Sequence, residues 1–110
     1  MNFRDFDTFV FDLDGTICID DVWQGPEHIG MPIPSMIMRM KRLIRRGTIV
    51  KIFTARMGRP GNVVGPIQDW LEEQGLPRLE VTNVKDPDCV LIYDDKARQV
   101  LHNTGKVVNA

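Results

Sequence analysis

Strand-like and helix-like patterns alternate along the whole chain, and this alternation constrains the fold more than any other feature. Short apolar runs predict strands at residues 7–12, 48–53, 79–81, 89–93 and 106–108. Helical spacing of apolar residues between them predicts helices at 35–46, from Pro66 onward, and at 96–103. Strands that alternate with helices pair in parallel through right-handed crossovers. The sequence therefore predicts a three-layer, Rossmann-like α/β fold with a small, mainly parallel sheet.

Capping residues predict where the two longer helices begin and end. Ser35 is expected to cap the first helix, and Gly47 to end it in the left-handed conformation. Pro66 is expected as the first residue of the second helix, because an interior proline removes a hydrogen bond and clashes with the preceding turn. Gly75 is expected to close that helix.

Size and composition indicate one globular domain over residues 1–110. The chain is 43% hydrophobic and 26% charged, and its net charge of -1 gives no global bias toward nucleic acid or membrane. The spacing of Cys18 and Cys89 does not resemble a metal site. With no signal peptide or long apolar stretch in the sequence, we expect a cytoplasmic protein with reduced thiols and no membrane partner.

Polar side chains follow the strands at the edge where a parallel α/β sheet binds its ligands. The residues concerned are Asp12 and Asp14 after the first strand, Thr54, Ala55 and Arg56 after the second, Thr82, Asn83 and Lys85 after the third, and Asp94 and Asp95 after the fourth. Clustered carboxylates repel one another and are costly to desolvate. Two acidic pairs at one edge therefore predict a site for a cation or a phosphoryl group.

The segment 9–16, Phe-Val-Phe-Asp-Leu-Asp-Gly-Thr, resembles the first motif of the haloacid dehalogenase (HAD) superfamily, most of whose members are magnesium-dependent phosphatases. The resemblance implies a HAD-like domain in which Asp12 is the nucleophile and forms an aspartyl-phosphate. It implies that Asp14 protonates the leaving oxygen and then activates water. Dehalogenase members do not use this second acid or a metal, so Asp14 favours a phosphatase. Thr16 is expected to organise the loop.

Two further motifs of the superfamily have candidates here. Thr54, at the end of an apolar strand, is the counterpart of the residue that hydrogen-bonds a phosphoryl oxygen. Lys85 is by chain order the counterpart of the lysine that offsets the charge of nucleophile and phosphate, and Lys96 competes for that role. A solvated loop lysine is the other interpretation of Lys85.

The fourth motif, Leu91-Ile92-Tyr93-Asp94-Asp95, resembles the metal-binding acid pair of the superfamily. The resemblance implies a Mg²⁺ ion bound by the Asp12 carboxylate, the Asp14 backbone carbonyl and Asp94, with Asp95 binding directly or through water. Residues 94–100 are also similar to the acidic motif and following helix in the phosphatase domain of polynucleotide kinase-phosphatases.

Residues 17–34 are too few to form a folded cap domain, so the predicted site is open. An open site suits a bulky substrate or a cap borrowed from another subunit of a homo-oligomer. Arg56 and Arg59 are candidates to bind a second phosphate or a carboxylate, or are solvated. Trp23 is a candidate to stack on a base or sugar, or to pack within the flap.

The function that these motifs predict is magnesium-dependent hydrolysis of a phosphomonoester. The expected substrate is a small phosphorylated metabolite, a nucleotide or a nucleic-acid end. The alternatives are a non-catalytic phosphate- or partner-binding module and a phosphotransferase that uses an acceptor other than water. The four acids Asp12, Asp14, Asp94 and Asp95 argue against the non-catalytic alternative, since a binding module has no need of carboxylates that repel one another.

Overall fold

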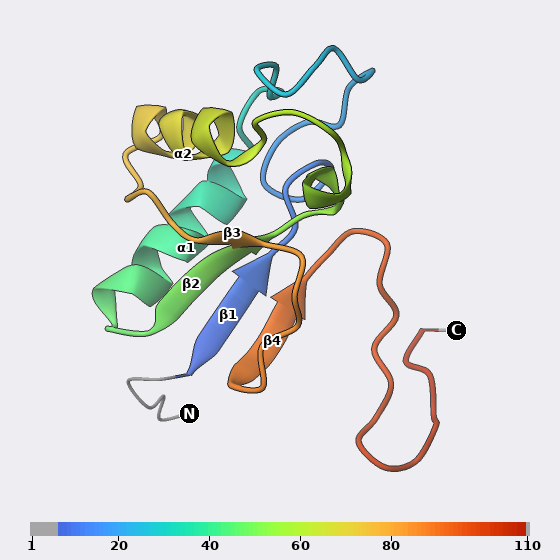
Figure 1. Ribbon diagram of the computed structural model, residues 1–110. Coiled ribbons are helices and arrows are strands. Elements are labelled where there is room, and N and C mark those ends of the chain that lie inside the picture. The colour runs from blue at the N-terminus through green and yellow to red at the C-terminus, as the bar shows by residue number, and fades with distance from the viewer. Residues whose placement is uncertain (1–6, 110) are drawn as a thin grey trace.

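A computed structural model describes residues 7–109 as an α/β unit built on a parallel sheet (Figure 1). The sheet has four strands in the order β3-β2-β1-β4, and each neighbouring pair is parallel. The strands are β1 (Thr8–Phe11), β2 (Ile49–Phe53), β3 (Val81–Thr82) and β4 (Cys89–Tyr93). The predicted α/β class and parallel sheet are confirmed, and the described residues contain no cap domain. The strand predicted at 79–81 is shorter than expected and lies at 81–82.

Two helices of the described chain, α1 (Pro34–Arg45) and α2 (Val64–Glu73), connect β1 to β2 and β2 to β3. Both pack on one face of the sheet. Phe9 and Phe11 of β1 pair in register with Val50 and Ile52 of β2, so these four side chains share that face. The same buried core contains Ile37, Met40 and Leu43 of α1 and Ile67, Trp70 and Leu71 of α2. Within residues 7–109, no helix is both long and apolar enough to cross a membrane.

The predicted ends of α1 are half right. Gly47 follows the helix with a φ of 88°, as expected for a left-handed terminator. The predicted cap is wrong, because Ser35 lies inside the first turn and the capping position is held by Ile33, which makes no side-chain bond. Pro34 starts the helix instead, since its fixed φ is already helical and its missing N–H is not needed there.

The predicted start of α2 is wrong by two residues. The helix begins at Val64, and Pro66 lies within its first turn. A proline is tolerated there because the first N–H groups of a helix have no acceptor inside the helix. Gly75 follows the helix with a φ of 80° and confirms the predicted end.

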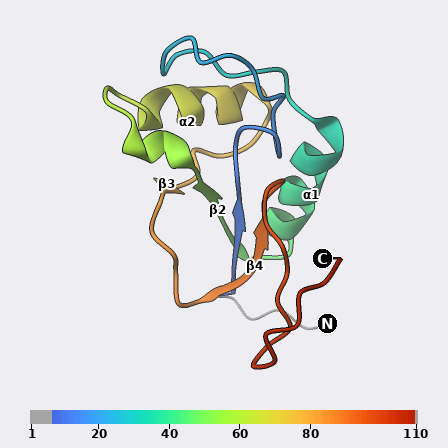
Figure 2. The same cartoon turned by 90° about the vertical axis from the view of Figure 1, so that its right-hand side faces the viewer.

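The helix predicted at 96–103 and the strand predicted at 106–108 are not formed. The segment after β4 is irregular, with one isolated bridge between Val100 and Val107 (Figure 2). Its apolar side chains stay exposed, Val100 by 54% and Leu101 by 39%. A helix of this length is marginal in water unless an apolar face is buried against a neighbour.

The expected third layer depended on the helix predicted at 96–103, which is not formed in the described chain. Residues 83–88 join β3 to β4 as a loop, which partly covers the sheet face opposite α1 and α2. An ion pair of 2.7 Å between Lys51 Nζ and Asp86 holds this loop against β2. Val10, which faces this loop, is only 3% exposed. A loop therefore takes the place of a helical layer on part of this face.

The flap, residues 17–33, leads from β1 to α1 without a helix or strand of its own. Its two ends are tied together, because the N–H of Ile19 donates to the carbonyl of Met31 (2.8 Å) and that of Ile33 to the carbonyl of Ile17 (2.9 Å). The flap starts directly after Asp12–Thr16 and so lies beside the carboxyl end of the sheet (Figure 1).

Candidate active site

The carboxyl ends of the strands open into a cleft of about 560 Å³. The cleft brings together five of the residues that the sequence predicts for the site, together with the competing lysine Lys96. These residues are Asp12, Asp14, Thr54, Arg56, Asp94 and Lys96. The predicted convergence at the edge of the sheet is therefore present, and the flap residues Asp20, Asp21 and Trp23 add to the same cleft.

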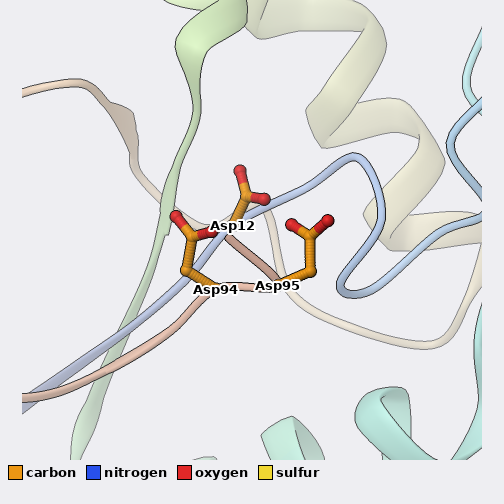
Figure 3. Close-up of side chains that lie close together, drawn as sticks. All are labelled: Asp12, Asp94 and Asp95. Carbon is orange, nitrogen blue, oxygen red and sulfur yellow. The ribbon is translucent and has the colours of Figure 1, made fainter. Parts of the chain in front are cut away.

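Three carboxylates form the centre of the site (Figure 3). Each of Asp12, Asp94 and Asp95 offers an oxygen that lies within 4.8 Å of those of the other two. The pairing of β1 with β4 causes this proximity, because Phe11 lies opposite Tyr93 and each precedes an aspartate. The N–H of Asp12 donates to the carbonyl of Tyr93 (2.9 Å), and the Phe11 and Tyr93 rings stack with centroids 4.4 Å apart.

The acid cluster is electrostatically strained in the absence of a cation. The pKa of Asp12 is raised from 3.8 to about 7, chiefly by burial and further by the neighbouring Asp94 and Asp95. Desolvation and like-charge repulsion both disfavour the ionised form, and a divalent cation bound between the oxygens would remove both penalties. Carboxylate oxygens are the ligands that Mg²⁺ prefers, so the donor set fits this ion.

Thr16 links Asp12, which follows β1, to Asp95, which follows β4, and Gly15 leaves room for the Asp95 carboxylate. The Thr16 hydroxyl accepts a bond from the backbone N–H of Asp95 (3.1 Å) and lies 3.4 Å from carboxylate oxygens of Asp12 and Asp95. Gly15 has a φ of 86°, and a Cβ there would lie 2.7 Å from the Asp95 carboxylate. A side chain at position 15 would therefore displace an acid of the cluster, whereas Thr16 organises the loop as predicted.

The carboxylate of Asp14 lies outside the acid cluster and is bound by Arg56. Nε and Nη2 of Arg56 each donate to a different oxygen of Asp14, both at 2.8 Å. Nη1 of Arg56 donates to the carbonyl of His28 in the flap (2.9 Å), and the side chain is only 7% exposed. Three of the five N–H groups of Arg56 are therefore bound within the protein, and its expected role in binding a second anion stays a prediction.

Sequence reasoning missed this pairing, although one signal was available. Asp14 follows β1 and Arg56 follows β2, and these strands are neighbours in the sheet. Opposite charges after neighbouring parallel strands meet at the same edge, so the pair was open to prediction once the strand order was known.

Thr54, which the sequence predicts to hydrogen-bond a phosphoryl oxygen, directly follows β2 and lines the cleft. It is 3% exposed and caps the short 3₁₀ helix η1 (Ala55–Gly58), because its hydroxyl accepts a bond from the N–H of Arg56 (3.1 Å). A hydroxyl that accepts one bond still has its proton to donate. Thr54 is therefore able to donate a hydrogen bond into the cleft.

The structure separates the two candidate lysines. Lys96 lines the cleft, and its backbone N–H donates to Asp94 (2.8 Å), which fixes it beside the acid cluster. Lys85 lies instead in a shallow groove on the opposite face of the sheet, with Val10 and Phe53. Placing Lys85 at the site was wrong, because the Lys51–Asp86 ion pair draws the 83–88 loop across that opposite face.

Comparison with known proteins supports the fold and does not name a function. No known protein-family model and no curated protein matches the chain. A solved structure of a conserved protein from Bacteroides thetaiotaomicron is similar, with a TM-score of 0.62 and 22% sequence identity. The similarity covers 82% of this chain and 76% of that one. At this identity the likeness extends to the α/β architecture alone.

Proposed function

We propose that this chain is a magnesium-dependent phosphomonoester hydrolase of the HAD superfamily. The observation that carries the proposal is the cluster of Asp12, Asp94 and Asp95 at the end of two adjacent parallel strands. The raised pKa of Asp12 supports the proposal, because a bound cation would offset the repulsion by Asp94 and Asp95 that contributes to it. Bound Mg²⁺ would neutralise the acids and polarise a phosphoryl group for attack. Two free thiols, Cys18 and Cys89, support the cytoplasmic setting that we propose with it.

The proposed reaction has two steps. A carboxylate oxygen of Asp12 attacks phosphorus, the bond from phosphorus to the leaving oxygen breaks, and that oxygen takes a proton from Asp14. Water then attacks the phosphorus of the aspartyl-phosphate, gives its proton to Asp14, and frees phosphate and Asp12. A carboxylate has about four lone-pair sites, so Asp14 can take a proton while Arg56 holds it. Thr54 and Lys96 would bind the phosphoryl oxygens.

The first test is phosphate release from a panel of phosphomonoesters, measured with Mg²⁺ and with EDTA. We expect turnover with Mg²⁺, none with EDTA, and a higher Mg²⁺ requirement in Asp94→Asn. Asp88→Asn is the matched control, because Asp88 is exposed and lies at the other end of β4. Turnover that resists EDTA would overturn the metal-dependent mechanism. A folded protein that binds phosphate but turns over nothing would favour the binding module, and label transfer to an added alcohol would favour the phosphotransferase.

Substitution of each of the two candidate lysines provides a second prediction. Lys96→Ala is expected to lower kcat/KM about tenfold to a hundredfold, because a charged donor to the phosphate is lost. Lys85→Ala is the control and is expected to stay within about twofold of the unmodified protein, because it lies on the other face of the sheet. Steady-state kinetics on one phosphomonoester measures both. The reverse ranking would return the role to Lys85.

A further inference from the structure

The side of the cleft formed by the flap carries an aromatic ring beside two guanidinium groups. The ring is that of Trp23, which lines the cleft and is 37% exposed. The Cζ atom of Arg59 lies 4.2 Å from the ring centroid, and that of Arg56 lies 5.0 Å from it. Both distances are within the range of cation–π attraction, so the two arginines hold the indole at the wall of the cleft.

The two arginines differ in their capacity to bind a ligand. Arg56 is buried, and three of its five N–H groups donate to Asp14 and His28. Arg59 is exposed at the cleft, and within residues 7–109 no carboxylate forms an ion pair with it. Arg59 therefore brings an unneutralised positive charge to the cleft, next to the indole.

The cleft is also larger than a phosphate group requires. Its volume of about 560 Å³ is in the range of sites that bind whole organic ligands. The acid cluster, Thr54 and Lys96 account for one phosphoryl group, whereas Trp23 and Arg59 have no part in that chemistry. These two residues therefore point to further groups on the substrate.

On the basis of the proposed function, we infer that the substrate is a phosphomonoester that also carries an aromatic ring and a second anionic group. The ring stacks on Trp23, the second anion binds Arg59, and the phosphoryl group to be hydrolysed lies at Asp12. This is the chemistry of a nucleoside bisphosphate, and equally of the phosphorylated end of a nucleic acid, in which a phosphodiester supplies the second anion.

Activity on a graded set of substrates tests the inference. Glycerol 2-phosphate has neither extra group, thymidine 5′-monophosphate adds the ring, and thymidine 3′,5′-bisphosphate adds the ring and the second anion. Trp23→Ala is expected to lower kcat/KM about tenfold or more for both thymidine compounds and by less than about twofold for glycerol 2-phosphate. Trp23→Phe, which keeps an aromatic face, should retain most of the activity. Arg59→Gln should lower kcat/KM about fivefold or more for the bisphosphate alone.

A thymidine oligonucleotide with a terminal phosphate distinguishes the two sources of this chemistry. A higher kcat/KM for the oligonucleotide than for the bisphosphate would assign the site to nucleic-acid ends. The opposite order would assign it to free nucleotides.

Binding gives a second readout that does not depend on turnover. In an Asp12→Asn background, calorimetry should show that Trp23→Ala weakens thymidine 3′,5′-bisphosphate about tenfold and leaves inorganic phosphate unchanged. Equal losses on all ligands, or none, would mean that Trp23 only packs the flap and would overturn the inference while the proposed function stands. Absence of turnover with ring-dependent binding intact would overturn the proposed function instead.

Discussion

Asp12→Asn is expected to reduce phosphate release to the background of the assay and, at the same time, to stabilise the metal-free protein above neutral pH. The loss of turnover follows because an amide does not form the acyl-phosphate that the carboxylate forms. The gain in stability follows because the substitution removes one of three mutually repelling acids, which lie within 4.8 Å of one another. A residue that only supported the fold would not produce opposite effects on activity and stability.

The pH dependence of this stabilisation has a definite sign. The pKa of Asp12 is about 7 in the folded protein, against an ordinary value of 3.8. Below about pH 4 the carboxyl is protonated in both states, so its contribution to folding is fully present. As the pH rises from there through about 7, the folded state retains a proton that the unfolded state has lost, and stability falls.

Chemical denaturation in EDTA at about pH 4 and about pH 8 measures this effect. At the higher pH we expect the free energy of unfolding of the variant to exceed that of the unmodified protein by about 2 kcal/mol, after allowance for solvent screening. At the lower pH the two free energies should be equal. Mg²⁺ should restore stability to the unmodified protein but much less to the variant. A variant that is no more stable at the higher pH would contradict the account of a strained, cation-requiring cluster.

Arg56→Gln is expected to lower kcat about a hundredfold to ten thousandfold, the usual contribution of a positioned acid and base. It should also lower the free energy of unfolding by about 2 kcal/mol, because Asp14 and the carbonyl of His28 lose their buried donor. Arg56→Lys is expected to recover only part of either loss, since an ammonium cannot donate to both Asp14 oxygens in the planar geometry of a guanidinium.

Kinetics separates the two roles that have been considered for this arginine. A group that positions Asp14 affects kcat and the pH profile, whereas a group that binds a second anion on the substrate affects mainly KM. If Asp14 is the group positioned, the double variant with Asp14→Asn should lose little more than either single one. Arg45→Lys, an exposed change on α1, is the control. A loss confined to KM would mean that Arg56 binds substrate directly.

The sequence by itself determined the sheet and the acid cluster. The strands β1, β2 and β4 coincide with short, mostly apolar runs bounded by polar residues, which is the pattern from which they were predicted. The carboxyl ends of parallel strands share one edge, so the strand pattern predicted that Asp12, Asp94 and Asp95 lie at that edge, and the pairing of β1 with β4 brings their oxygens within 4.8 Å. Both kinds of evidence are local in the chain, and neither depends on how side chains pack.

The tertiary structure alone decided which arginine and lysine side chains line the site, and whether the chain after β4 forms a helix. Arg56 lies in η1 and Arg59 directly follows it, yet the first is buried against Asp14 and the second is exposed beside Trp23. Lys85 was drawn to the far face of the sheet by the pairing of a different lysine, Lys51, with Asp86. Residues 96–103 have a helical pattern but no surface on which to bury it, so they remain irregular. A long charged side chain can reach several partners, and the fold determines which of them it contacts. A short helix forms only where a neighbouring element buries its apolar face. Contacts between residues that are distant in the chain therefore determine both outcomes.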